Sequence, residues 1–197
     1  MFQSIVCQVA QYDAEILESL VELAVEIARE GREGRRIGTL FTLGDHEAVL
    51  AKSRPLILDP LWGHPESSRH LSSPGLRGTL KELAQLDGAF VIRQDGTVLS
   101  ACRYLDAVAS DIELPLGLGS RHIAAANMSS ITNAVTVVVS ESSVVRLFCH
   151  GKLVGEIIPE LWMFDRTAQL RGLVKKETFG ELTVLTPTNG HLSAKPE

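Results

Sequence analysis

The stretch AVTVVVSE, residues 134–141, constrains the fold more than any other part of the sequence. Residues 134–139 are all apolar or β-branched, without the alternation of polar and apolar side chains that marks a strand facing water on one side. A continuous run of this kind is typical of a strand in the middle of a sheet that is covered on both faces. The chain must therefore build a sheet and supply helices to pack against it, which predicts an α/β fold.

Residues 13–30 form the clearest predicted helix, because apolar side chains recur there at spacings of three and four. Asp13 is placed to cap the first turn, and Gly31 is placed to end the helix. With 197 residues, enough for one sizeable domain, we expect a single α/β domain with a mixed central β-sheet flanked by α-helices. The other predicted helices cover 76–86, 120–130 and 159–177, and the predicted strands cover 37–44, 48–58, 87–93, 97–105 and 134–141, with a hairpin over 144–158.

Composition excludes several classes of protein. The net charge of −5 argues against a partner that is a nucleic acid polymer, although a local cationic site can still hold a nucleotide. Cys7, Cys102 and Cys149 form no CxxC pair, so we expect reduced thiols rather than a disulfide framework or a zinc site. The sequence has no apolar run near the roughly 18 residues that cross a bilayer, and no signal peptide pattern. We therefore expect a cytoplasmic protein that does not insert into a membrane.

The first candidate site is the sequence GLGSRH, which begins at Gly117. Gly117 and Gly119 let a ligand approach the backbone closely, and Ser120 can cap the helix that follows. The unpaired N–H groups and the dipole of a helix N-terminus attract anions, and Arg121 and His122 lie in that first turn. The pattern fits a phosphate site, although a capped helix with solvent-exposed Arg and His would have the same sequence.

Two acidic motifs are further candidates. Asp87 precedes Gly88 and Ala89 at a helix-to-strand junction, where a carboxylate can hold a divalent cation against the phosphates of a ligand. Ser140 and Glu141 end the apolar strand, and ligands of open α/β sheets gather outside strand ends. Taken singly, a simple Asp-Gly turn and the polar edge of a hairpin explain these residues as well.

In combination, the three motifs resemble the catalytic domain of the diadenylate cyclases. The matching text is LDGAFVI at 86–92, LGSRHIAA at 118–125 and NAVTVVVSE at 133–141, in the order of the family motifs. The segments GTLFTLGD and RPLILDPLWGHPE also look like the shorter, archaeal-style members. The resemblance divides the chain into an N-terminal helix and linker (1–34), a nucleotide-binding core (35–158) and a C-terminal helix and tail (159–197).

The resemblance implies condensation of two ATP molecules into cyclic di-AMP with release of two pyrophosphates, and Mg²⁺ or Mn²⁺ as cofactor. Each subunit would hold one ATP, so a homo-oligomer with at least a transient face-to-face dimer is expected. Asp87, Arg121 and His122 would be catalytic, and Asp87 and Glu141 would bind the metal. The implied ATP-binding residues are Gly88, Ala89, Leu105, Gly119, Ser120, Arg121, His122 and Ser140.

Two residues depart from the family pattern. Ile123 stands where the family often has a second arginine, and Ser120 stands where threonine is common. The missing cation leaves open an alternative function, a module of the same fold that binds ATP or cyclic di-AMP without turnover. Arg103, Arg69 or the arginines at 32–36 are candidates to replace the charge. Ile123 itself is expected on the buried side of its helix.

Apolar residues complete the set of expectations. Tyr104, Leu105 and Leu86 are candidates to line an adenine slot, with the protein core as the alternative. Trp62 is expected in the core rather than at an interface. The apolar surface of the helix at 13–30 is wide, which leaves a third possible function, a scaffold subunit that assembles through this helix.

Overall fold

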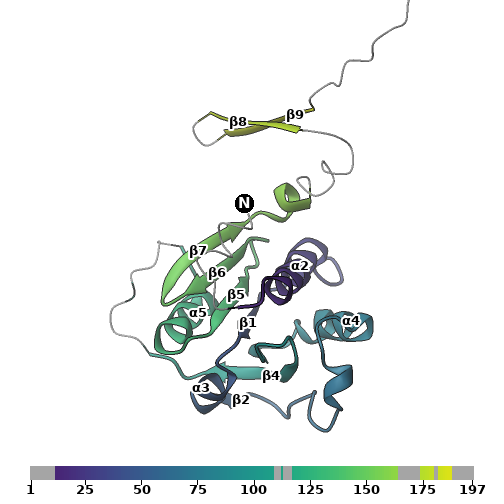
Figure 1. Cartoon of the computed structure of the whole chain (residues 1–197), viewed down its shortest axis with the longest axis vertical. Coiled ribbons are helices and arrows are strands. Elements are labelled where there is room, and N and C mark those ends of the chain that lie inside the picture. The colour runs from purple at the N-terminus through teal and green to yellow at the C-terminus, as the bar shows by residue number, and fades with distance from the viewer. Residues whose placement is uncertain (1–11, 109–111, 113–116, 164–173, 180–181, 188–197) are drawn as a thin grey trace, which may run out of the picture. The chain divides into compact units, whose positions relative to one another are not determined.

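The structure, a computed structural model, describes residues 12–108, 112, 117–163, 174–179 and 182–187 (Figure 1). The chain divides into two compact units, Met1–Pro159 and Glu160–Glu197. The first unit contains a seven-stranded sheet with its helices. The second contains an antiparallel pair of strands, β8 (Val174–Phe179) and β9 (Leu182–Pro187).

The seven strands lie in the order β2-β4-β3-β1-β5-β6-β7. β1 and β3 are parallel, whereas all other neighbouring pairs are antiparallel. The predicted mixed sheet is therefore confirmed. Its strands are β1 (Thr39–Leu43), β2 (Ser53–Pro55), β3 (Ala89–Ile92), β4 (Val98–Leu105), β5 (Val135–Val139), β6 (Val145–Cys149) and β7 (Lys152–Ile157).

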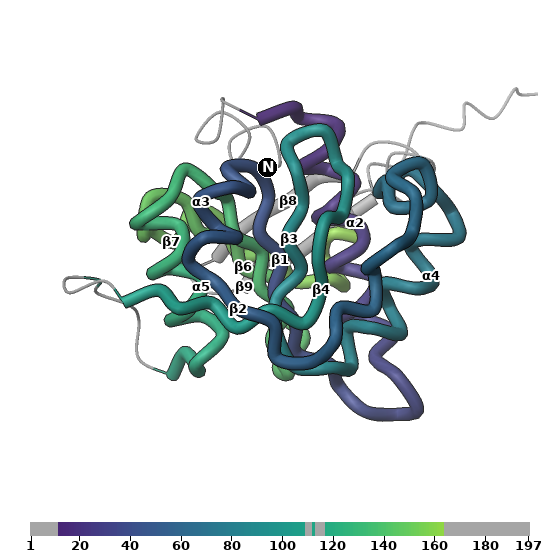
Figure 2. Tube along the Cα trace, turned by 90° about the horizontal axis from the view of Figure 1, so that it is seen from below, coloured from purple at the N-terminus to yellow at the C-terminus, as the bar shows by residue number. Residues whose placement is uncertain are grey.

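Helices cover both faces of this sheet, as Figures 1 and 2 show. α5 (Ser120–Ile131) packs on β5, β6 and β1 from one side, and α2 (Ala14–Glu30) packs on β5 and β6 from the other. Every residue of β1 and of β5 is buried. The apolar run at 134–139 thus lies where its pattern predicts, in the middle of a sheet that is shielded on both sides.

α2 begins and ends as the sequence predicts. The Asp13 carboxylate accepts a hydrogen bond from the Glu15 N–H at 2.8 Å, and Gly31 takes a positive φ of 57° at the C-terminal end. The apolar surface of this helix is covered by its own unit, which leaves no reason to assign the helix to assembly. Its buried residues are Leu17, Leu20, Val21, Leu23, Ala24, Val25, Ile27 and Ala28.

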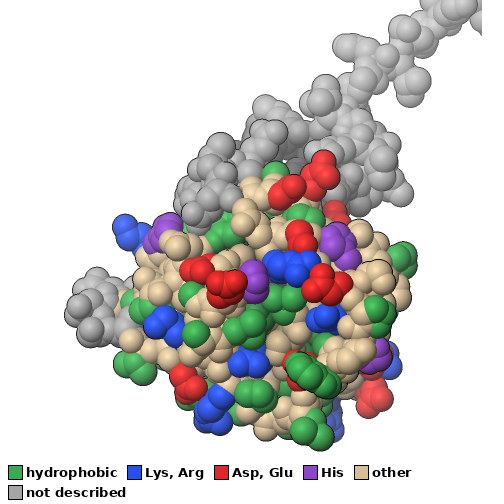
Figure 3. Space-filling model, turned by 60° about the horizontal axis from the view of Figure 1, so that its bottom comes forward, with side chains coloured by type: hydrophobic (Ala, Val, Ile, Leu, Met, Phe, Trp, Pro, Cys, Tyr) green, Lys and Arg blue, Asp and Glu red, His purple; other side chains and the backbone are tan. Residues whose placement is uncertain are grey.

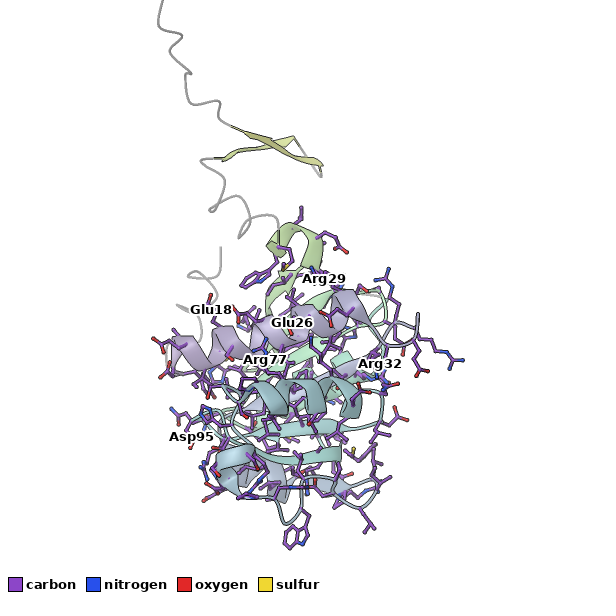
Figure 4. The ribbon with its side chains drawn as sticks, turned by 90° about the vertical axis from the view of Figure 1, so that its right-hand side faces the viewer. Glu18, Glu26, Arg29, Arg32, Arg77 and Asp95 are labelled. Carbon is purple, nitrogen blue, oxygen red and sulfur yellow. The ribbon has the colours of Figure 1, made fainter. Side chains whose placement is uncertain are left out.

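α4 (Pro74–Leu83) lies beside α2 and is joined to it by ion pairs (Figure 4). Arg77 and Lys81 on α4 contact the Glu26 carboxylate on α2 at 2.9 and 2.8 Å. Burial raises the pKa of Glu26, but the hydrogen bonds from Lys81 and Arg77 outweigh it and hold this pKa below its ordinary value. These contacts align α4 with the polar side of α2, whose apolar side faces the sheet.

Two predicted elements are wrong in part. Residues 48–58, expected as a strand, form α3 (His46–Ala51) and then the short strand β2. The residues EAVLAK are mostly good helix formers, and only Val49 of α3 is buried, so the helix needs little apolar periodicity. The helix expected over 159–177 is helical at 159–163, whereas β8 occupies Val174–Phe179. The β-branched residues of VKKETF and LTVLTP favour such a strand pair.

Trp62 lies outside the core, contrary to expectation, with 87% of its surface exposed. The loop that carries it is held by Asp59, whose carboxylate accepts hydrogen bonds from the Leu61 N–H at 2.9 Å and the Ser100 hydroxyl at 2.5 Å. Trp62 follows this anchored turn, and its indole is exposed to solvent. An aromatic residue in a proline-rich loop therefore marks a surface here, not a core.

Two of the three cysteines lie in the described part of the chain. Cys102 and Cys149 are free and buried, and burial raises the pKa of both thiols. Cys7 lies outside the described residues. Among the described helices, none combines the length and the apolar character needed to cross a membrane.

The stacked pair Phe41 and Phe90 supports a first prediction. Their ring centroids lie 4.9 Å apart in the buried centre of the sheet. Phe41→Ala should lower the free energy of unfolding by about 3–5 kcal/mol, because it removes a fully buried aromatic ring. Trp62→Ala is the matched control and should change stability by less than about 0.5 kcal/mol. Urea titration measures both, and equal effects would contradict the placement of these rings.

Candidate functional site

The strand directions bring three chain segments to one edge of the sheet. β1 and β3 are parallel, so Gly38 and Asp87, which precede them, lie at the same edge. β5 is antiparallel to β1, with Thr39 opposite Val139, so Ser140 and Glu141 follow the strand at that edge too. Residues that are far apart in the sequence therefore become neighbours because of strand order alone.

Arg121 in the first turn of α5 connects these segments. One guanidinium nitrogen lies 3.3 Å from an Asp87 carboxylate oxygen, and another lies 3.1 Å from a Glu141 oxygen. The Asp87 and Glu141 side chains are 86% and 68% exposed, and that of Arg121 is 36% exposed. Ion pairs this exposed contribute little to stability, so the guanidinium can leave the carboxylates for a stronger anion.

Two glycines make room for this arrangement. Gly88 has a φ of 109°, and a Cβ there would lie 2.5 Å from the backbone carbon of Cys102, so only glycine fits beside Asp87. A Cβ on Gly38 would lie 2.7 Å from the Arg121 guanidinium. The sequence analysis missed Gly38, although its place directly before a buried strand was a usable signal.

Two cavities adjoin Arg121, which lines both of them. The first has a volume of about 580 Å³ and is largely apolar. Tyr104 and Leu105, two of the candidates for an adenine slot, line it, whereas Leu86 is not among its lining residues. The sequence analysis missed several of the other lining residues, which carry no motif of their own: Leu40, Leu56, Ala107, Ala124 and Asn127.

The second cavity has a volume of about 370 Å³ and a more polar lining than the first. It is lined by the first turn of α5 and by the residues that follow β5, with Arg146 from β6. Ser120 is the first residue of α5, and Gly119 occupies the N-cap position without a side-chain hydrogen bond, so the expectation that Ser120 caps the helix is wrong. The first N–H groups of a helix lack partners within it, so a ligand here would meet unpaired donors.

The predicted site residues divide between the two cavities. Asp87, Gly88, Ala89 and Leu105 line the first, and Gly119, His122, Ser140 and Glu141 line the second, while Ser120 and Arg121 line both. The structure thus brings the candidate residues together around one arginine.

His122 is buried, with its ring against Arg146. Nε2 lies 3.3 Å from an Arg146 guanidinium nitrogen, which can only donate, so Nε2 accepts and a neutral ring carries its proton on Nδ1. Burial, followed by the charge of Arg146, lowers the pKa of His122 below 6.5, and the backbone of Gly119 only partly opposes this shift. The ring is therefore neutral near pH 7.

Comparison with known proteins places this chain in a family. The family model described as DisA bacterial checkpoint controller nucleotide-binding matches residues 26–153. The chain belongs to this family. A diadenylate cyclase of Methanocaldococcus jannaschii is 47% identical over 144 residues, which cover 73% of this chain and 45% of that protein. A diadenylate cyclase of Haloferax volcanii is 40% identical over 151 residues, which cover 76% and 55%.

The chain therefore spans about half the length of the curated relatives it matches. Among solved structures, a crystal structure of a double mutant of DacA from Staphylococcus aureus is 21% identical. It covers 79% of this chain and 94% of that one, with a TM-score of 0.49.

The departure from the family pattern at Ile123 has a structural consequence. This residue is 49% exposed and lines the first cavity, so the expectation that it is buried is wrong. α5 instead turns His122, Ala125 and Met128 toward the core. The side chain at position 123 therefore faces the first cavity rather than the protein core.

Asp87 and Glu141 fit a metal ion only together with a ligand. The described residues contain no group of three or more His, Cys, Asp or Glu side chains that could hold an ion by themselves. Carboxylate oxygens suit Mg²⁺, which usually retains phosphate and water ligands rather than a cage made of protein. Both carboxylates are exposed and contact Arg121, so phosphate oxygens that draw Arg121 away would leave them free for a cation.

The pKa of His122 predicts how stability depends on pH. Its pKa lies below 6.5 in the folded chain, so the unfolded chain binds more protons as pH falls through 6.5. Stability should therefore decrease as pH falls through 6.5, and His122→Gln should weaken this dependence because glutamine does not titrate. Thermal unfolding at several pH values measures it, and identical pH slopes for both chains would contradict the prediction.

Proposed function

We propose that this protein is a diadenylate cyclase, which condenses two ATP molecules into cyclic di-AMP and releases two pyrophosphates. Family membership and the two relatives named diadenylate cyclase support this proposal. The observation that carries it is the contact of Arg121 with Asp87 and Glu141 beside two cavities. A cation-binding carboxylate and a helix N-terminus that share one space suit a nucleoside triphosphate.

In this proposal each cavity holds one part of ATP. The apolar side chains of Leu105 and Tyr104 suit adenine, and the backbone at Gly88 and Ala89 comes close to the nucleoside. The triphosphate lies along Ser120, Arg121 and the first turn of α5, which lead into the second cavity. In a nucleotide that spans both cavities, the α-phosphate would lie beside Arg121, and the new bond forms at this phosphate.

Each half-reaction forms one phosphoester bond and breaks one phosphoanhydride bond. The 3′-hydroxyl of one ATP attacks the α-phosphorus of the other, pyrophosphate leaves, and the hydroxyl proton passes to Asp87. Arg121 and the N–H groups of α5 stabilise the negative charge that gathers on the departing pyrophosphate. A bound Mg²⁺ or Mn²⁺, held by Asp87, Glu141 and phosphate oxygens, would neutralise phosphate charge and polarise the attacking hydroxyl.

The reaction requires two copies of the chain, because each holds one ATP and the two must meet face to face. Exposed apolar side chains suit such a contact: Tyr104 is exposed and lines the first cavity together with Leu56, and Leu58 and Trp62, which follow Leu56 in the chain, are exposed as well. Figure 3 shows hydrophobic side chains at the surface between charged ones on one face of the molecule. We further propose that the protein works in the cytoplasm, where ATP is available.

Incubation of the purified chain with ATP and Mn²⁺, with products separated by chromatography, tests the function. Cyclic di-AMP and pyrophosphate in a ratio of one to two support the cyclase. ATP that is bound but unchanged would instead support a binding module, in which Ile123 has removed a required cation. Absence of nucleotide binding at millimolar ATP would contradict both.

Asp87→Asn should lower the formation of cyclic di-AMP by at least about a hundredfold, because the neutral amide binds a cation more weakly than a carboxylate and cannot take the proton. Asp87 is exposed, so the melting temperature should change little. Product formation and thermal unfolding are measured on the same preparation. Near-normal turnover would remove Asp87 from the proposed mechanism.

Arg121→Ala should weaken ATP binding by about tenfold or more, since a charge-assisted hydrogen bond contributes about 1.5–3 kcal/mol. Arg77→Ala is the control, because this arginine pairs with Glu26 on α2 and lines neither cavity of the described structure. Titration calorimetry gives the dissociation constants. An unchanged value for Arg121→Ala would contradict a phosphate site at the start of α5.

A further inference from the structure

The second cavity is lined by an arginine side chain that belongs to none of the sequence motifs. Arg146 lies on β6, and it lines this cavity together with Arg121, His122 and Ser140. Its Nε atom contacts the Glu156 carboxylate at 2.7 Å, and a terminal nitrogen lies 3.3 Å from His122. The guanidinium is thus held in a fixed position beside the start of α5.

The arginines that the sequence suggested as replacements either have their guanidinium groups bound to other parts of the protein or lie away from the two cavities. Arg103 lines the first cavity, but its guanidinium donates to the backbone carbonyl and the hydroxyl of Ser53, both at 2.8 Å, and so ties β2 to β4. Arg69 donates to the carbonyl of Val98 at 3.0 Å. The arginines at 32–36 line neither of the two cavities found in the described residues.

We propose that Arg146 binds the β- and γ-phosphates of ATP in the second cavity and supplies the positive charge that Ile123 does not provide. This inference rests on the proposed function. Ile123 faces the first cavity, so an arginine there and Arg146 would approach the nucleotide from different cavities. Because Arg121 lines both, a nucleotide with its base in the apolar first cavity directs its phosphate tail toward Arg146.

The chemistry of the second cavity fits that tail. The hydroxyls of Ser140 and Ser142 and the first turn of α5 offer hydrogen bonds, and Arg146 can offer a planar, fork-shaped donor to two phosphate oxygens. The neutral ring of His122 accepts from the Arg146 guanidinium and does not repel it. Contact with Glu156 orients the guanidinium before ATP arrives, which reduces the entropy lost on binding.

A purely structural role for Arg146 makes a different prediction. Arg146 stands directly opposite Glu156 in the pairing of β6 with β7, so the two could serve only to join these strands. In that case, removal of Arg146 and removal of Glu156 should change the affinity for the triphosphate by similar amounts. A phosphate-binding role requires the arginine and not the glutamate.

The experiment compares nucleotides with and without the phosphate tail. The full chain is titrated with 3′-deoxy-ATP and 3′-deoxy-AMP, which bind but lack the attacking hydroxyl, in the presence of Mg²⁺. Arg146→Gln should weaken binding of the triphosphate by about tenfold or more while changing the affinity for the monophosphate less than twofold. Arg146→Lys should give an intermediate loss, because lysine retains the charge without the fork. Glu156→Gln should change the triphosphate affinity less than twofold, because the amide oxygen of glutamine can still accept a hydrogen bond from Arg146 and hold the guanidinium in place.

The outcomes separate the inference from the function on which it rests. The role of Arg146 would be overturned if Arg146→Gln lost the same affinity for the triphosphate as for the monophosphate. It would also be overturned if Glu156→Gln lost as much triphosphate affinity as Arg146→Gln. In either case, synthesis of cyclic di-AMP by the unmodified chain would still support the proposed function. An unmodified chain that binds neither nucleotide would overturn both. Thermal unfolding of each variant shows whether it is folded, and Arg146→Lys provides a second test if Arg146→Gln is not.

Discussion

The directions of β1, β3 and β5 are the constraint on which the rest of the structure depends. A parallel pair beside an antiparallel pair makes β3 begin where β5 ends, at the edge where β1 also begins. Asp87 and Glu141 are thereby gathered at one place, and α5, which covers the same strands, brings Arg121 between them. If β3 or β5 ran in the opposite direction, Asp87 and Glu141 would lie at opposite ends of the strands.

The charged side chains at this edge form contacts that a ligand can replace. Two exposed carboxylates share one guanidinium, and a second guanidinium, that of Arg146, is held by Glu156 and backed by a neutral histidine. A triphosphate carries more negative charge than either carboxylate and would draw Arg121 toward itself. The same movement would leave Asp87 and Glu141 available to a cation, so binding of nucleotide and metal would favour each other.

Local sequence patterns correctly predicted those helices and strands in which periodicity, capping residues and turn residues agree. The apolar run at 134–139, the capped helix after Asp13 and the hairpin that turns at His150 and Gly151 were predictable because pattern, cap and turn residues agree. The short helix α3 and the pair β8–β9 were not, because brief segments with mixed spacing take the structure that their neighbours allow. Trp62 shows that the hydrophobicity of a single residue does not decide its burial.

The sequence by itself determined that a sheet covered on both faces must form. It also determined which residues carry charge and which are glycine in the candidate ligand-binding segments, because these properties are local. Only the tertiary structure decided that Gly38 lies under Arg121, that Ile123 faces a cavity while His122 is buried, and that Arg146 joins the second cavity. Such relations depend on the rotation of a helix and the register of strands that are distant in the chain. They are fixed by packing across the sheet, which no local pattern encodes.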